Sequence, residues 1–166
     1  MRPVVTILSS LAVATFGAQA AAQQAHAGIG AVVDEGFDEL GFTGRVGYDL
    51  NRNFGIEGEL NYFSVDTFGT DVDVFTYIAF AKAQTTVTPQ ISVFARLGYG
   101  GLTADADGLE SESEDAFAYG VGAEYAVTPS SGIRADYTRY DLGEGGGDDE
   151  GFLSLAYVFR FGGAQR

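Results

Sequence analysis

The sequence predicts an all-β fold, an eight-stranded antiparallel up-and-down transmembrane β-barrel preceded by a cleaved signal peptide. Three observations predict it: strand-like segments in which apolar residues alternate with small or polar ones, connections that alternate between short turns and longer acidic segments, and an apolar N-terminal run. The chain has 166 residues, no Cys and a formal net charge of -14. This composition suits one domain and excludes a disulfide framework or a thiolate metal site.

The N-terminus has the pattern of a secretory signal. Arg2 precedes an apolar run over residues 4–17, and the small residues Ala18 and Ala20 follow at the spacing that a signal peptidase reads. The apolar run is shorter than the roughly 20 residues that a membrane-spanning helix needs. We therefore interpret the segment as a cleaved signal and not as an anchor.

This signal divides the chain into two parts. Residues 1–22 form the predicted signal peptide and residues 23–166 the predicted barrel domain. Cleavage is expected after Ala20 or Ala22, with a later site at residues 25–27 as the alternative. The whole chain carries 23 acidic residues against 9 basic ones, so nucleic acid is excluded as a partner because its phosphates need the opposite charge.

Eight later segments have strand periodicity, and most have the length of about ten residues that a tilted strand needs to cross a bilayer. They cover residues 28–33, 41–50, 54–65, 72–84, 90–103, 116–127, 132–142 and 151–161. In the last segment, Leu153, Leu155 and Phe159 lie on an apolar face, whereas Ser154 and Arg160 lie on the other. The fourth segment is less regular because it is apolar on both faces.

The connections between these segments come in two alternating kinds. Short ones with Asn, Pro and Ser lie around residues 51–53, 85–89 and 128–131, and acidic ones lie around residues 34–39, 66–71, 105–115 and 144–150. In an up-and-down meander, alternate connections emerge at opposite ends. The pattern therefore predicts all acidic connections at one end, as in outer-membrane barrels with short periplasmic turns and longer extracellular loops.

The polar faces carry nearly balanced charges that we expect inside the barrel. The basic residues are Arg45, Lys82, Arg96, Arg134 and Arg160, and the acidic residues are Asp49, Glu57, Glu59, Glu124 and Asp136. An eight-stranded barrel has an interior just wide enough for side chains to fill, and a buried ion without a partner costs several kcal/mol. These charges are therefore predicted to pair and to plug the barrel without an open pore.

Four stretches together resemble the OmpA-like eight-stranded outer-membrane β-barrel family, within the class of small porin-like surface-antigen barrels. They are Gly44–Glu57, Phe94–Gly100, Tyr119–Tyr125 and Tyr157–Phe161. The resemblance covers nearly the whole mature chain. It implies a place in the outer membrane of a Gram-negative bacterium and contact with outer-membrane lipid.

The same resemblance implies a partner in biogenesis. In the family the terminal aromatic residue is read by the barrel-assembly machinery, which implies that Tyr157, Phe159 and Phe161 form the assembly signal. This chain departs from the family pattern because residues 162–166 follow Phe161.

The sequence predicts no enzyme. His26, the only histidine, lies near the cleavage zone, so a Ser-His pair is not expected and no catalytic residue is assigned. Residues 105–112 contain only a fragment of calcium-loop spacing, so neither a metal site nor a cofactor is predicted. The predicted function is a non-enzymatic structural or surface-interaction role with an unassigned loop ligand. The alternatives are a narrow-pore small-solute or ion channel and a soluble periplasmic lipocalin-like carrier.

Overall fold

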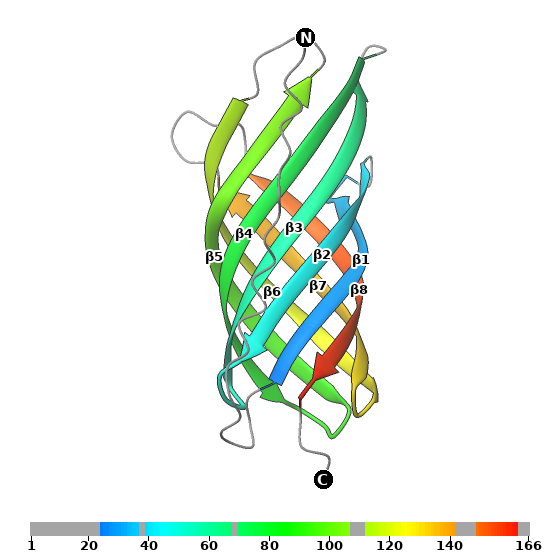
Figure 1. Cartoon of the computed structure of the whole chain (residues 1–166), viewed down its shortest axis with the longest axis vertical. Coiled ribbons are helices and arrows are strands. Elements are labelled where there is room, and N and C mark those ends of the chain that lie inside the picture. The colour runs from blue at the N-terminus through cyan, green and yellow to red at the C-terminus, as the bar shows by residue number, and fades with distance from the viewer. Residues whose placement is uncertain (1–23, 37–38, 68–69, 107–111, 142–148, 163–166) are drawn as a thin grey trace.

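A computed structural model describes residues 24–36, 39–67, 70–106, 112–141 and 149–162. Eight antiparallel strands form a closed barrel in which each strand pairs with its neighbours in sequence (Figure 1). They are β1 (Gln24–Asp34), β2 (Leu40–Asp49), β3 (Phe54–Thr67), β4 (Thr70–Thr86), β5 (Ile91–Ala106), β6 (Glu112–Thr128), β7 (Ser131–Asp141) and β8 (Glu150–Phe161). The barrel closes where β1 pairs with β8, from Ala25 opposite Phe161 to Asp34 opposite Phe152. The predicted fold class is confirmed.

All eight predicted strands are present, but some of their bounds differ. β1 begins at Gln24 and not at Gly28, and β6 begins at Glu112, so part of the third acidic connection is strand. The ladder between β5 and β6 continues through Leu102 opposite Glu114. The backbone ladder thus extends past the alternating apolar residues, and the sequence pattern does not indicate this extension.

The connections sort to two ends of the barrel as predicted. The β2–β3, β4–β5 and β6–β7 connections lie at one end, called here the turn end, and the strand ends that the four acidic connections join lie at the other, the loop end (Figure 1). The short turns are held by local side-chain contacts. The Asn51 Oδ1 accepts hydrogen bonds from the backbone N–H groups of Asn53 and Phe54, each at 2.9 Å.

The outer wall of the barrel is apolar. Apolar side chains alternate outward along the strands, and many are large, with Phe42 70% and Leu155 59% exposed. In β4, the ambiguous strand, Phe75 and Tyr77 face outward whereas Thr76 and Ile78 are buried. No helix in the described part of the chain is long and apolar enough to cross a membrane. A soluble carrier would need the apolar face inside, so this arrangement does not fit the soluble alternative.

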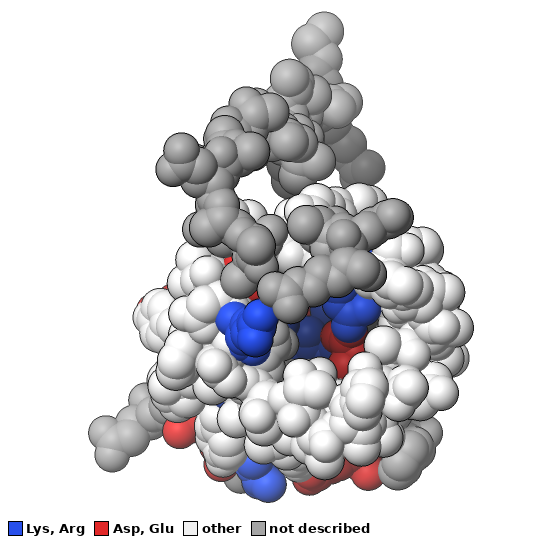
Figure 2. All heavy atoms as spheres, turned by 90° about the horizontal axis from the view of Figure 1, so that it is seen from below, with Lys and Arg blue, Asp and Glu red and all other residues white. Residues whose placement is uncertain are grey.

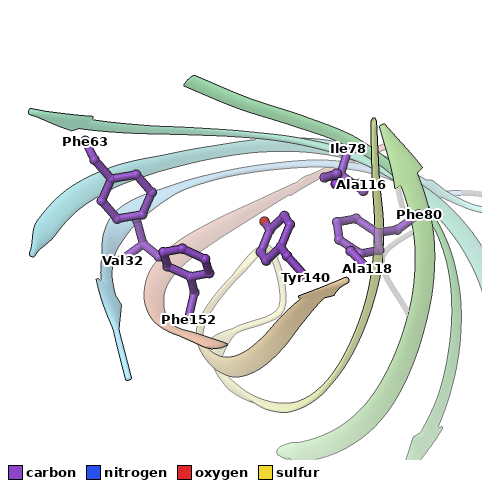
Figure 3. Close-up of a cluster of buried hydrophobic side chains, with 8 residues drawn as sticks. All are labelled: Val32, Phe63, Ile78, Phe80, Ala116, Ala118, Tyr140 and Phe152. Carbon is purple, nitrogen blue, oxygen red and sulfur yellow. The ribbon is translucent and has the colours of Figure 1, made fainter. Parts of the chain in front are cut away.

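The interior has two layers, and this differs from the uniformly polar interior that the sequence predicts. Toward the loop end lies a cluster of buried apolar side chains, called here the apolar layer (Figure 3). It consists of Val32, Phe63, Ile78, Phe80, Ala116, Ala118, Tyr140 and Phe152. Figure 3 shows Tyr140 between one group that contains Phe63 and Phe152 and another that contains Ile78 and Phe80. The charged residues occupy the middle of the barrel and its turn end.

Candidate functional site in the barrel interior

Three arginines from three strands meet around one carboxylate in the middle of the barrel. Arg45 of β2, Arg96 of β5 and Arg134 of β7 occupy inward positions and are buried. Asp136 accepts a hydrogen bond from the Nη1 of Arg45 at 2.7 Å and one from the Nη2 of Arg96 at 2.5 Å. Its Oδ2 also accepts from the Nε of Arg134 at 3.1 Å. Asp136 therefore joins strands that are far apart in sequence.

Two carboxylates of β3 complete this centre. Arg134 binds Glu57 through two hydrogen bonds, from Nη1 to Oε2 at 2.6 Å and from Nη2 to Oε1 at 2.9 Å. Glu59 pairs with the Nη1 of Arg96 at 2.5 Å and with the Nη2 of Arg45 at 3.3 Å. Such two-pronged and shared guanidinium contacts are the strong class of charged hydrogen bonds. Three arginines thus neutralise three carboxylates across the barrel.

A second tier lies nearer the turn end and contains the residue that sequence reasoning missed. Lys82 approaches Asp49 at 3.1 Å and Glu57 at 3.5 Å. The Nε2 of His26, which is 5% exposed, lies 3.1 Å from the Oε2 of Glu57. A Cβ at Gly47 would lie 2.4 Å from the same ring nitrogen, so the glycine leaves room for the imidazole.

One feature of the sequence does indicate that His26 faces inward. It is in phase with Gly28, Gly30 and Val32, the inward positions of β1, so extending the strand by four residues would have placed it inside. Its nearness to the predicted signal-cleavage site hides this periodicity.

The remaining predicted pair lies at the turn-end mouth. Arg160 of β8 forms an ion pair with Glu124 of β6, and both side chains are partly exposed. Looking into the barrel from the turn end, Figure 2 shows basic and acidic residues inside a ring of uncharged ones. Among the described residues, no ion pair links Arg160 and Glu124 to the other eight charged residues that the sequence placed inside. The structure therefore brings eight of the ten into one network and two into a separate pair.

Polar side chains join the ionic network to the apolar layer. The Asn61 Nδ2 donates to the hydroxyl of Tyr140 at 2.9 Å, to the Oγ1 of Thr76 at 3.0 Å and to Glu59 at 3.3 Å. The Nη2 of Arg45 donates to the Oγ of Ser154 at 2.9 Å. Tyr140 thus has its ring in one layer and its hydroxyl in the other, which makes the two layers continuous.

Aromatic rings cover the faces of two arginines. The guanidinium carbon of Arg96 lies 4.2 Å from the ring centre of Phe80, and that of Arg134 lies 3.9 Å from that of Phe94. A Cβ at Gly122 would lie 2.4 Å from Phe94, so this inward glycine makes room for the ring. These cation–π contacts stabilise charges that have lost their water. They also explain why aromatic residues occupy inward positions that alternation assigns to polar ones.

The arrangement of the network supports a structural role more directly than a catalytic one. The described polar partners of His26 are Glu57 and Asp49, and no serine is among them. Within the described ranges, no group of three or more His, Cys, Asp or Glu side chains is placed to hold a metal ion. A network of this kind is tolerated because each buried charge has partners. Removing one partner would leave another buried charge unpaired.

The other predicted site residues lie on the outer wall or outside the described residues. Tyr157, Phe159 and Phe161 alternate outward at the turn end of β8, and the Tyr157 hydroxyl donates to the Oγ of Ser131 at 2.8 Å. The predicted signal peptide, residues 1–22, lies outside the described residues, as do residues 107–111 and 142–148 of the acidic connections.

Comparison with solved structures shows the fold. Ail, the attachment invasion locus protein of Yersinia pestis, is 23% identical with a TM-score of 0.61, over 84% of this chain and 99% of that chain. Neisserial surface protein A is 19% identical with a TM-score of 0.61, over 84% and 96%. The N-terminal β-barrel domain of Pseudomonas aeruginosa OprF is 17% identical with a TM-score of 0.60, over 86% and 100%. These likenesses show the fold.

Sequence comparison gives the family itself. No curated protein has significant similarity to the chain. A family model described as "Outer membrane protein beta-barrel domain" matches residues 8–161, which is most of the chain. The resemblance to the OmpA-like barrels is thereby confirmed, and so is the outer-membrane location. The chain belongs to the outer-membrane β-barrel protein family.

Proposed function

We propose that this protein is a non-enzymatic structural or surface-interaction barrel, whose plugged interior anchors four acidic connections outside the cell. The proposal rests on one observation: the ionic network and the apolar layer follow one another along the barrel axis, and both fill the interior. The ionic network spans the middle, where Asp136 alone contacts three arginines, and the apolar layer follows toward the loop end. A permeating ion would have to displace paired charges and then pass a ring of apolar side chains.

The proposed plug is supported by the energy that ion passage would cost as well as by the filling of space. Replacing a salt-bridged partner with a passing ion means breaking contacts such as the two hydrogen bonds between Arg134 and Glu57. Breaking a buried pair costs about 3–5 kcal/mol. The apolar layer offers no compensating polar group except the Tyr140 hydroxyl, which already accepts from Asn61. These features support a plug over a channel.

The acidic connections define the chemistry of any surface partner. The sequence places carboxylates in all four, and Asp34, Glu39 and Glu150 lie at the loop end. A partner must therefore carry positive charge or reach this surface through cations. Ail has been crystallised with the heparin analogue sucrose octasulfate, a sulfated anion. In this chain such an anion would meet like charges, so we expect a different ligand class.

The proposed role includes no catalysis, and it includes an assembly signal on β8. The single histidine is held between carboxylates, which supports a non-enzymatic role. The proposed assembly signal, Tyr157, Phe159 and Phe161, lies on β8, the strand that closes the barrel against β1. A recognition element for the assembly machinery on the closing strand would present itself before the seam forms. Removal of residues 1–22 during export is part of the same proposal.

Conductance across a planar lipid bilayer tests the proposal. The refolded wild-type barrel should give no steady ionic current, and heat-modifiable migration on a gel should verify that the same sample is folded. A matched preparation of a folded porin would show that the assay detects open pores. Steady single-channel currents from the wild-type barrel would overturn the plug and favour the narrow-pore alternative.

A further inference from the structure

The lipid-facing wall of the barrel has a hollow on one side. A groove of about 750 Å³ lies over β4, β5 and β6. Six outward side chains line it, namely Ala83, Thr85, Val93, Ala95, Val121 and Ala123. They form two adjacent rungs across the three strands, because Ala83 and Val121 both lie opposite Ala95, while Thr85 and Ala123 both lie opposite Val93.

The hollow exists because small side chains stand where large ones stand elsewhere on the wall. Phe54 lies opposite Ala83 on the β3 side, and Leu97 and Tyr119 occupy the next outward positions toward the loop end. All three are more than two-fifths exposed. Phe94 and Gly122 also line the groove, although Phe94 points inward, so the backbone of the sheet contributes to the floor. The groove is therefore a depression between taller apolar neighbours.

The height of the groove selects one membrane leaflet. Thr85 and Val93 lie only a few residues from the β4–β5 turn, so the groove is near the turn end. In outer-membrane barrels the short turns face the periplasm. The occupant must therefore come from the periplasmic leaflet, and the apolar lining suits an acyl chain.

A basic residue belongs to the turn that is attached beside this groove. The β2–β3 turn, which contains Arg52, is attached to β4 beside the groove, because the Gln84 N–H donates to the Asn53 carbonyl at 2.7 Å and the Asn53 Nδ2 donates to the Gln84 carbonyl at 3.2 Å. Arg52 is exposed. The sequences of the three short turns contain no Asp or Glu. This edge therefore suits a negatively charged headgroup.

We propose that the groove on β4–β6 binds one acyl chain of an anionic phospholipid from the periplasmic leaflet, with the lipid phosphate at Arg52. The groove continues the established lipid-facing surface, but its depth and its neighbouring cation make it a selective position on that surface. The acyl chain fills the depression and the headgroup lies at the turn end, where Thr85 provides a hydroxyl.

Native mass spectrometry of the refolded full barrel tests the proposal. The barrel is prepared with phosphatidylglycerol or with phosphatidylcholine of identical chains, and the phospholipid retained after detergent exchange is counted. The wild type should retain one phosphatidylglycerol per barrel. Ala95→Leu and Ala123→Leu should each abolish this retention by filling the groove. Ala79→Leu, an outward substitution on β4 outside the groove, should leave retention unchanged.

Arg52→Gln separates the headgroup contact from the acyl contact. We expect retention of phosphatidylglycerol to fall by about tenfold, to the level of phosphatidylcholine, since one charged hydrogen bond is lost. Equal retention in the wild type and in both filled variants would overturn the proposal, provided that all migrate as folded barrels. Dimers that disappear on groove filling, without retained lipid, would instead identify an interface between two copies and would also overturn it.

Discussion

The ionic network and the apolar layer occupy the same barrel and the same inward positions, yet they seal it by different physics. In the network, each carboxylate such as Asp136 satisfies several cations, and the arrangement is tolerated only as a closed set. In the apolar layer, the side chains are held by close packing alone. The ring centres of Phe63 and Phe152, for example, lie 5.2 Å apart. The network should fail abruptly when one member is removed, and the apolar layer by degrees.

Removal of Arg96 should give the largest effect. Arg96→Ala deprives Glu59 and Asp136 of a partner that lies 2.5 Å from each, and it leaves both carboxylates buried with excess negative charge. We expect the free energy of unfolding to fall by about 3–5 kcal/mol in urea titrations of the barrel in lipid vesicles. Gln90→Ala, at an exposed turn position, is the control and should stay within about 0.5 kcal/mol. Equal unfolding curves for the wild type and Arg96→Ala would show that the network contributes little to the stability of the barrel.

Truncation in the apolar layer should cost less and for another reason. Phe152→Ala removes a ring packed against Phe63 and against Tyr140, whose centre lies 5.1 Å away, and it leaves a cavity without any unpaired charge. We expect a loss of about 3 kcal/mol in the same urea titration, with the bilayer still free of current because the ionic network remains. Leu155→Ala on the outer wall of the same strand should cost less, since lipid can fill its space. A steady current from Phe152→Ala would mean that the apolar layer alone closes the barrel.

Much of the outer wall could be predicted from sequence because it obeys one rule. Alternation placed Leu155 and Phe159 outward, and both are exposed in the barrel. The acidic and short connections likewise sort to opposite ends because an up-and-down meander leaves no other choice. In each case a local pattern, repeated along neighbouring strands, determined the result.

The interior could be predicted only in part because it depends on register across strands. That Arg96 faces inward follows from alternation, but its pairing with Glu59 and Asp136 depends on how β3, β5 and β7 are staggered around the barrel. The inward aromatic residues Phe80 and Phe152 break the alternation rule, because Phe80 packs against Arg96 of β5 and Phe152 packs against Tyr140 of β7 inside the barrel. No local pattern encodes such contacts.

Breaking the ion pair between Arg160 and Glu124 at the turn-end mouth should have the smallest effect on the free energy of unfolding. Arg160, like Arg96, pairs with a carboxylate, but its side chain is 19% exposed whereas that of Arg96 is 1% exposed. Water can therefore solvate Glu124 when the cation is removed. We expect Arg160→Gln to lower the free energy of unfolding by only about 0–1 kcal/mol, and less at high salt. A loss as large as that of Arg96→Ala would mean that membership of the barrel interior, and not depth of burial, determines what an ion pair contributes.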